Sequence, residues 1–201
     1  INYIQEIVSK WTAKQTKILS LEPKKLNDVW LDFARVANAM GVPESNSKTN
    51  IAISDRLKIL KDSLKEVKQK PTVLCIEWLE PLMIAANWVP ELVNLAGGLN
   101  LLSNSGSNSQ AFTWNKILKS NPDIIIFMPC GFDINRTKEE ILKANIDYSS
   151  NLKDKKTYVV DGNKYFNRPG PDLLESTRIL AEIIHPDIFP AKQHIERWVS
   201  L

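Results

Sequence analysis

The sequence is poor in cysteine, histidine and glycine and has no long apolar run, and each scarcity excludes a class of protein. Its 201 residues include 2 cysteines and 2 histidines, which supply neither a disulfide framework nor the spacing of a zinc site. Only 7 glycines exclude a collagenous chain. No stretch reaches the roughly 18 apolar residues that span a bilayer. The most apolar stretches, Val73 to Ile76 and Ile124 to Pro129, have the length of strands.

Charge of one sign is also lacking. Lys plus Arg number 26 against 23 Asp plus Glu, a net charge of +3, and the basic residues form no block. This distribution indicates no nucleic-acid partner. With 43% hydrophobic residues, the chain is expected to fold as one domain or one and a half. It starts at Ile1 without an initiator Met or a signal pattern, so we expect it to be cut from something longer.

Two amphipathic helices are predicted in the first third of the chain. Apolar residues recur every three or four positions from about Lys24 to Met40, and Gly41 marks the stop. A second pattern runs from about Ser47 to Val67 and is ended by Pro71. About 20 helical residues make a rod of roughly 30 Å, which crosses a whole domain face.

From Pro71 onward, short apolar runs alternate with helices. This order is typical of an α/β fold: a mostly parallel sheet sandwiched by helices, here one Rossmann-like lobe preceded by a long helix. The predicted buried strands are Thr72 to Ile76, Asp123 to Met128 and Thr157 to Val160. The predicted helices run from near Pro90 to Gly97, Trp114 to Ser120, Asn135 to Ala144, Pro171 to Ile184 and, as a last short helix, Pro190 to Leu201.

Ligands of parallel α/β sheets bind beyond the carboxyl ends of the strands. In this sequence the residues there are mostly large, flat or soft. The candidate lining residues are Trp78, Met83, Trp88, Met128, Cys130, Phe132, Tyr165, Phe166 and Arg168. This set suits a broad, largely apolar ligand held by stacking and area burial.

An enzyme is the alternative from another class. Cys130 beside Glu77 would serve as a nucleophile, or Glu77 and Glu80 as an acid and base pair. No histidine lies near Cys130 in sequence, and the chain has no Gly-rich phosphate loop, serine nucleophile elbow or metal-ligand cluster. The residues therefore favour binding without catalysis, with no metal and no cofactor.

Several separated motifs carry a resemblance to a known family. They are LSLEP at 19–23, CIEWLEPLM at 75–83, NWVPEL at 87–92, AGG at 96–98, DIIIFMPCGF at 123–132 and YFNRPGP at 165–171. In this order they resemble the periplasmic substrate-binding proteins of vitamin B12 and iron-siderophore ABC importers, most closely the cobalamin-binding branch. The resemblance covers essentially the whole chain.

The resemblance implies two α/β lobes joined by one long helix, with the ligand clasped between them. Residues 1–46 would then be a remnant of the N-terminal lobe with a helix, 47–70 the connecting helix and 71–201 the C-terminal ligand-binding lobe. Most of the first lobe would lie upstream of Ile1. A second lobe left uncovered is expected to associate as a homodimer.

The resemblance also assigns roles to individual positions. Met83 matches a contact beneath the ring of the ligand, and Trp88 with the loop from Met128 to Phe132 matches the cleft wall. Tyr165, Phe166 and Arg168 match the other side of the mouth. The resemblance also implies an acidic residue on each lobe that docks onto the membrane permease. In the second lobe that position falls at or beside Asn115, whose neutral amide can form a hydrogen bond but not a charge-assisted pair.

The expected function is therefore that of a periplasmic or extracytoplasmic substrate-binding component of an ABC importer, which captures a corrinoid such as vitamin B12. Alternatives within the superfamily are an iron-siderophore or haem. A degenerate lobe used only for self-association and an α/β enzyme using Cys130 are the alternatives from other classes.

Overall fold

The computed structural model describes residues 2–12, 16, 18–144, 152, 155–191 and 197–201. Its helices are α1 (Asn2–Trp11), α2 (Leu26–Ala39), α3 (Pro43–Ser63), α4 (Val89–Leu95), α5 (Trp114–Lys119), α6 (Ile134–Lys143), α8 (Gly162–Tyr165) and α9 (Leu173–Ile184). Its strands are β1 (Thr72–Leu79), β2 (Leu82–Ile84), β3 (Leu99–Asn100), β4 (Gln110–Ala111), β5 (Ile124–Phe127), β6 (Lys156–Val160) and β7 (Trp198–Ser200).

The sheet is parallel at its centre and antiparallel at its edges. Its order is β4-β2-β1-β5-β6-β7, with β3 pairing in parallel with the start of β1. The central strands β1, β5 and β6 are parallel, whereas β2, β4 and β7 pair antiparallel. Burial on both faces explains why the β5 sequence IIIF is continuously apolar. The predicted mostly parallel α/β fold is confirmed.

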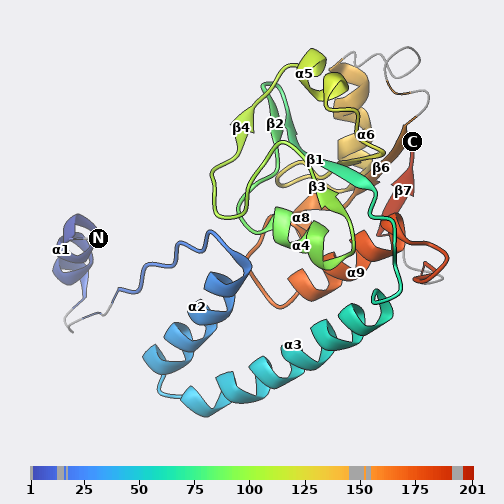
Figure 1. Cartoon of the computed structure of the whole chain (residues 1–201). Coiled ribbons are helices and arrows are strands. Elements are labelled where there is room, and N and C mark those ends of the chain that lie inside the picture. Colours follow the sequence, from blue (N-terminus) through green and yellow to red (C-terminus); the bar gives the residue numbers. More distant parts are fainter. Residues whose placement is uncertain (1, 13–15, 17, 145–151, 153–154, 192–196) are drawn as a thin grey trace.

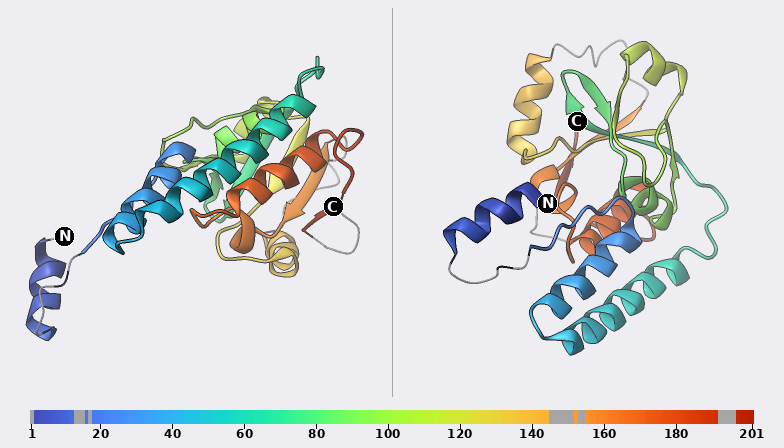
Figure 2. Two further views of the ribbon diagram at one scale, coloured as in Figure 1. Left: turned by 90° about the horizontal axis from the view of Figure 1, so that it is seen from below. Right: turned by 90° about the vertical axis from the view of Figure 1, so that its left-hand side faces the viewer.

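Helices cover both faces of the sheet (Figure 1). One face packs against α2, α3, α4 and α9, in a core that includes Val73, Cys75 and Ile126 from the strands. The other face packs against α5 and α6 through Ile117 and Ile141. The long α3 lies beside α9 beneath this sandwich, and α1 stands apart from it (Figure 2). Within the described residues, no helix is both long and apolar enough to cross a membrane.

The long predicted helix is present but displaced toward the N-terminus. It begins at Pro43 and ends at Ser63 instead of running to Val67. Proline suits the first helical turn because its missing N–H has no intrahelical partner there. After Ser63 the chain turns, and the Leu64 N–H donates to the carbonyls of Leu60 and Lys61, both at 3.2 Å.

The predicted last helix is wrong where the structure describes it. Trp198–Ser200 form β7, antiparallel to β6, while 192–196 lie outside the described residues. The strand is held by Arg197, which is 2% exposed and donates to the fully buried Glu182 carboxylate at 2.6 and 2.8 Å. This long-range ion pair has no signal in the local sequence of the tail.

Candidate functional site

The carboxyl ends of β1, β5 and β6 meet at one edge of the sheet, which we call the rim. The Met128 N–H donates to the Ile76 carbonyl at 2.8 Å, and the Cys130 N–H donates to the Glu77 carbonyl at 3.1 Å. After β6, the Asn163 N–H donates to the Phe132 carbonyl at 3.1 Å. These bonds join the three post-strand segments into one surface, as the sequence predicted.

Gly162 allows the closest approach at the rim. A Cβ atom built at this position would lie 2.4 Å from the Pro129 carbonyl oxygen and 2.7 Å from the Met128 carbonyl carbon. Both neighbours are backbone atoms of the β5 end, so the segment from β6 would have to move to accommodate any side chain. Glycine at 162 therefore sets how closely two sides of the rim approach each other.

Trp78 and Phe132 form an aromatic pair on the side of the rim nearest α6. Their ring centroids lie 5.3 Å apart at an angle of 43°, and the Arg136 guanidinium lies 5.4 Å from the centre of the Phe132 ring. Trp78 Nε1 donates to the Glu80 carbonyl at 2.9 Å, which fixes the indole. The pair lines a depression of about 370 Å³. Met83 is half-buried and lies opposite Trp78 in the β1–β2 register.

Trp88 and Tyr165 lie deeper, with 9% and 8% of their surface exposed. Trp88 Nε1 donates to the Phe166 carbonyl at 3.1 Å, which ties the start of α4 to the end of α8. The Lys164 ammonium lies 5.1 Å from the centre of the Tyr165 ring. These two aromatic residues belong mainly to the core and reach the surface with only a small part of each ring.

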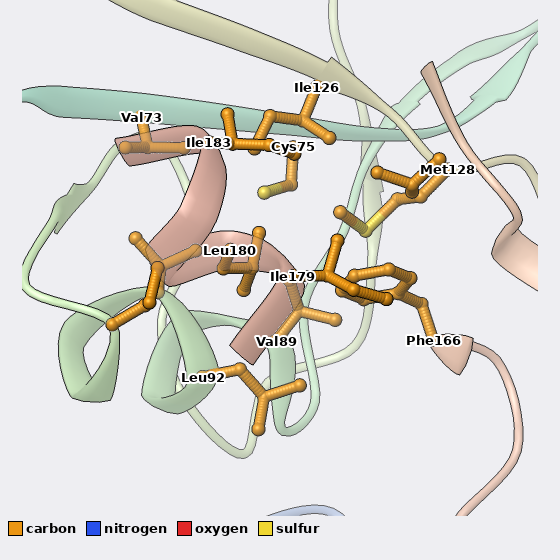
Figure 3. Packing of buried hydrophobic residues seen from close by; sticks show 14 of the residues in the cluster. Val73, Cys75, Val89, Leu92, Ile126, Met128, Phe166, Ile179, Leu180 and Ile183 are labelled. Carbon is orange, nitrogen blue, oxygen red and sulfur yellow. The ribbon is translucent and has the colours of Figure 1, made fainter. Parts of the chain in front are cut away.

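Met128 and Phe166 do not line the rim. They are 0% and 1% exposed, and both point into the core between the sheet and α9 (Figure 3). Met128 has the same orientation as Ile126 because side chains alternate along the chain leaving β5. The prediction that these two side chains face a ligand is corrected: in this structure neither is available to one.

The remaining predicted residues are accessible. Cys130 and Arg168 are exposed, and Arg168 donates to Asn163 Oδ1 at 3.0 Å. Asn115 is exposed in the first turn of α5, where Thr113 caps the helix.

Glu77 is a polar residue of the rim that the predicted lining omitted. Burial raises the pKa of its carboxyl, and the nearby Ser109 hydroxyl and Ala86 N–H oppose that rise. The sequence held a signal, because Glu77 has the same parity along β1 as Val73 and Cys75 and so ends a buried face at the carboxyl end of the strand.

The rim does not activate its thiol. Although Cys130 as a whole is exposed, partial desolvation of its thiol, followed by the nearby Glu77 carboxylate, raises the pKa of Cys130 to about 11. The thiol is therefore protonated at neutral pH and is a poor nucleophile. Among the residues that the structure describes, no group of His, Cys, Asp and Glu is arranged to hold a metal ion. The arrangement suits binding through area and hydrogen bonds.

Comparison with known proteins agrees with this geometry. A family described as periplasmic binding protein matches residues 12–149, more than half of the chain. Comparison with curated protein sequences yields no match.

Solved structures share the fold. An ABC transporter substrate-binding protein from Listeria monocytogenes EGD-e is 19% identical with a TM-score of 0.73, over 90% of this chain and 72% of that one. A periplasmic heme binding protein from Pseudomonas aeruginosa is 15% identical with a TM-score of 0.73, over 99% and 72%. The periplasmic vitamin B12 binding protein BtuF of Vibrio cholerae is 15% identical with a TM-score of 0.65, over 92% and 71%.

At these identities the solved structures establish the fold, and the match over residues 12–149 establishes the family. Members of this family bind substrates outside the cytoplasm and are not enzymes, in agreement with the predicted location and with the prediction of binding without catalysis. The chain belongs to the periplasmic binding protein family.

Proposed function

We propose that this protein is the substrate-binding component of an ABC importer and that it captures a corrinoid at the rim. The observation that carries the proposal is the aromatic pair of Trp78 and Phe132 beside the half-buried Met83, on a surface without an activated nucleophile. Such a surface matches a broad planar ligand. The CIEWLEPLM, NWVPEL and AGG motifs, which resemble most closely the cobalamin-binding branch, support the corrinoid in particular.

Affinity would come mainly from buried area. Covering an aromatic side chain contributes on the order of 1 to 3 kcal/mol. The indole of Trp78 is already held by its hydrogen bond to Glu80, so less side-chain entropy is lost on binding.

The proposed lobe organisation follows the helix α3. It has 21 residues and packs against both α2 and α9, as a rigid connector between two lobes would. We propose that residues 71–201 form the ligand-binding lobe and that a second lobe, joined through 1–46, completes the clasp. The chain spans 64% to 73% of the lengths of five solved structures that share its fold.

Docking onto a membrane permease is part of the same proposal. Asn115 occupies the predicted docking position and is exposed. Its amide would form neutral hydrogen bonds, which are weaker than the charge-assisted bonds of a carboxylate.

Calorimetric titration with cyanocobalamin tests the ligand. We expect measurable heat and an absorbance shift, and we expect Trp78→Ala and Phe132→Ala each to weaken binding about tenfold. Trp11→Ala is the matched control, because Trp11 is 85% exposed on α1, away from the sheet. No heat with cyanocobalamin, together with binding of haemin or a ferric siderophore, would reject the corrinoid.

A further inference from the structure

We propose that Glu77 determines specificity at the rim, in that its carboxylate accepts N–H groups from an amide-bearing macrocycle and disfavours a macrocycle that carries carboxylates there. This inference rests on the proposed function. It deepens that function by naming the chemical class that the site selects.

The backbone places Glu77 at an irregularity in β1. Ile76 pairs with Ile84 and Trp78 pairs with Met83, so β1 advances two residues while β2 advances one. Glu77 is therefore the extra residue of a β-bulge. Bulges interrupt the ladder and re-aim a side chain, and they are enriched beside functional sites.

Three segments from different parts of the chain surround this bulge. The Glu77 carbonyl accepts the Cys130 N–H at 3.1 Å. Its carboxyl lies close enough to the Ala86 N–H and the Ser109 hydroxyl for both groups to lower its pKa, and the buried Ser109 Oγ makes no hydrogen bond of ordinary geometry. The segment after β2 is itself fixed, because the Asn87 N–H donates to the Ser107 carbonyl at 3.0 Å. These segments therefore enclose the bulge at the carboxyl end of β1.

The neighbours of the Glu77 carboxyl are neutral. The titratable groups that feel its charge are the thiols of Cys75 and Cys130, whose pKa values are raised mainly by burial and further by Glu77. Burial is the largest influence on the pKa of the Glu77 carboxyl, and the influences that lower this pKa come from the neutral Ser109 and Ala86 groups. A half-buried carboxylate without a counter-ion can accept further hydrogen bonds, and it repels another anion placed beside it.

This arrangement distinguishes planar macrocycles by their periphery. A corrinoid carries carboxamides, whose N–H groups donate to a carboxylate without adding charge. Haem carries carboxylates, and a like charge placed against Glu77 reduces affinity. The cationic residues near the rim already have partners: Lys164 lies over the Tyr165 ring, Arg168 donates to Asn163, and Arg136, over the Phe132 ring, forms an ion pair with Glu140.

The test compares Glu77→Gln and Glu77→Ala with the wild type by titration with cyanocobalamin and, separately, with monomeric haemin. Glutamine keeps an acceptor and the shape but removes the charge. We expect Glu77→Gln to bind haemin about tenfold more tightly while cyanocobalamin changes less than about threefold. We expect Glu77→Ala to weaken cyanocobalamin binding about tenfold because the acceptor is lost.

Glu139→Gln is the matched control, because Glu139 is an exposed carboxylate on α6 and the substitution makes the same change in net charge. It should leave the ratio of the two dissociation constants unchanged. Far-UV circular dichroism of each variant establishes that it is folded, and the affinity ratio separates selection of the ligand from a general loss of structure.

The outcomes separate the two proposals. If the wild type binds cyanocobalamin and Glu77→Gln leaves the ratio of affinities at the wild-type value, the role of Glu77 is overturned and the proposed function stands. If the wild type does not bind cyanocobalamin, or binds haemin more tightly, the corrinoid function fails first and the role of Glu77 fails with it.

Discussion

The two ends of the central strands carry carboxylates in opposite situations. At the amino end, Asp123 accepts the Thr72 backbone N–H and the Thr72 hydroxyl, both at 2.7 Å. Those hydrogen bonds hold the pKa of Asp123 below its usual range. At the carboxyl end, burial raises the pKa of Glu77. The Asp123 carboxylate joins β1 to the start of β5, whereas nearby polar groups only partly offset the effect of burial on the Glu77 carboxylate.

This difference between Asp123 and Glu77 indicates that the carboxyl end of the sheet contains a group that lowers the stability of the fold. A carboxylate with its donors supplied favours the folded state, whereas a desolvated one without a counter-ion opposes it. Desolvated carboxylates without a counter-ion are common at functional sites, because a ligand can supply the hydrogen bonds that the protein lacks. The carboxyl end of the sheet is therefore expected to tolerate changes differently from the amino end.

The largest effect should come from adding a side chain at Gly162, where the backbone of 128 and 129 leaves no room for one. Gly162→Ala places a methyl group against the backbone of 128 and 129, so we expect a loss of about 3 kcal/mol in the free energy of unfolding. Urea denaturation measures it. Gly170→Ala is the control, because a Cβ there would meet no atom within 4 Å. Equal effects at both glycines would show that the contact at 162 does not restrict the rim.

The second prediction concerns the reactivity of the exposed thiol. A pKa raised from 9.0 to about 11 lowers the thiolate fraction about a hundredfold at neutral pH. Cys130 should therefore react with iodoacetamide far more slowly than free cysteine, and the fully buried Cys75 should not react in the folded protein. Mass spectrometry of the labelled peptides measures both rates. Faster labelling of Cys130 than of free cysteine would favour the enzyme alternative.

The third prediction tests the amino end of the sheet. Asp123→Asn should cost about 1 kcal/mol at neutral pH, a value limited by solvent screening of this exposed group. Because the folded pKa of Asp123 is lowered, its contribution is full above the unfolded value of 3.8 and is lost as pH falls through the folded pKa. Chemical denaturation at a series of pH values measures the difference. A difference that persists in strong acid would contradict this account.

The smallest effect has the opposite sign and belongs to the carboxyl end. Glu77→Gln should raise the melting temperature at neutral pH by about 1–2 °C. Because the folded pKa of Glu77 is raised, the cost of its charge is present above the folded pKa and vanishes below the unfolded value of 4.5. Thermal melts at pH 7 and in acid test this, with Glu139→Gln as the control. A lower melting temperature at pH 7 would mean that the charge of Glu77 stabilises the fold.

The predicted elements of the central sheet are confirmed because their signals are local. Short runs rich in β-branched and apolar residues produced β1, β5 and β6, and apolar spacing with proline at the start and glycine at the end produced α4. The edge strands β2 and β7 depend on pairing across the chain. In β7, three residues are held by the buried contact between Arg197 and Glu182, which no pattern within the tail indicates.

The sequence predicts the location of the candidate site better than it predicts which side chains line that site. The meeting of three strand ends follows from parallel topology, and the aromatic pair of Trp78 and Phe132 lies there. Whether a side chain at such an edge points to solvent depends on parity and on bulges. That dependence is why Met128 and Phe166 are buried and why Glu77, on the bulge, was not included among the predicted lining residues.

The carboxylate of Glu91 links two segments that are distant in sequence. One oxygen accepts the Leu26 N–H at the start of α2 at 2.6 Å, and the other accepts the Ser105 hydroxyl at 2.7 Å. The first residue of α2 and the loop that carries Ser109 are therefore both bonded to the same side chain, Glu91 on α4. A rotation of α2 against the sheet must either break one of these bonds or carry the loop along, which couples the position of α2 to that of the loop from Ser105 to Ser109.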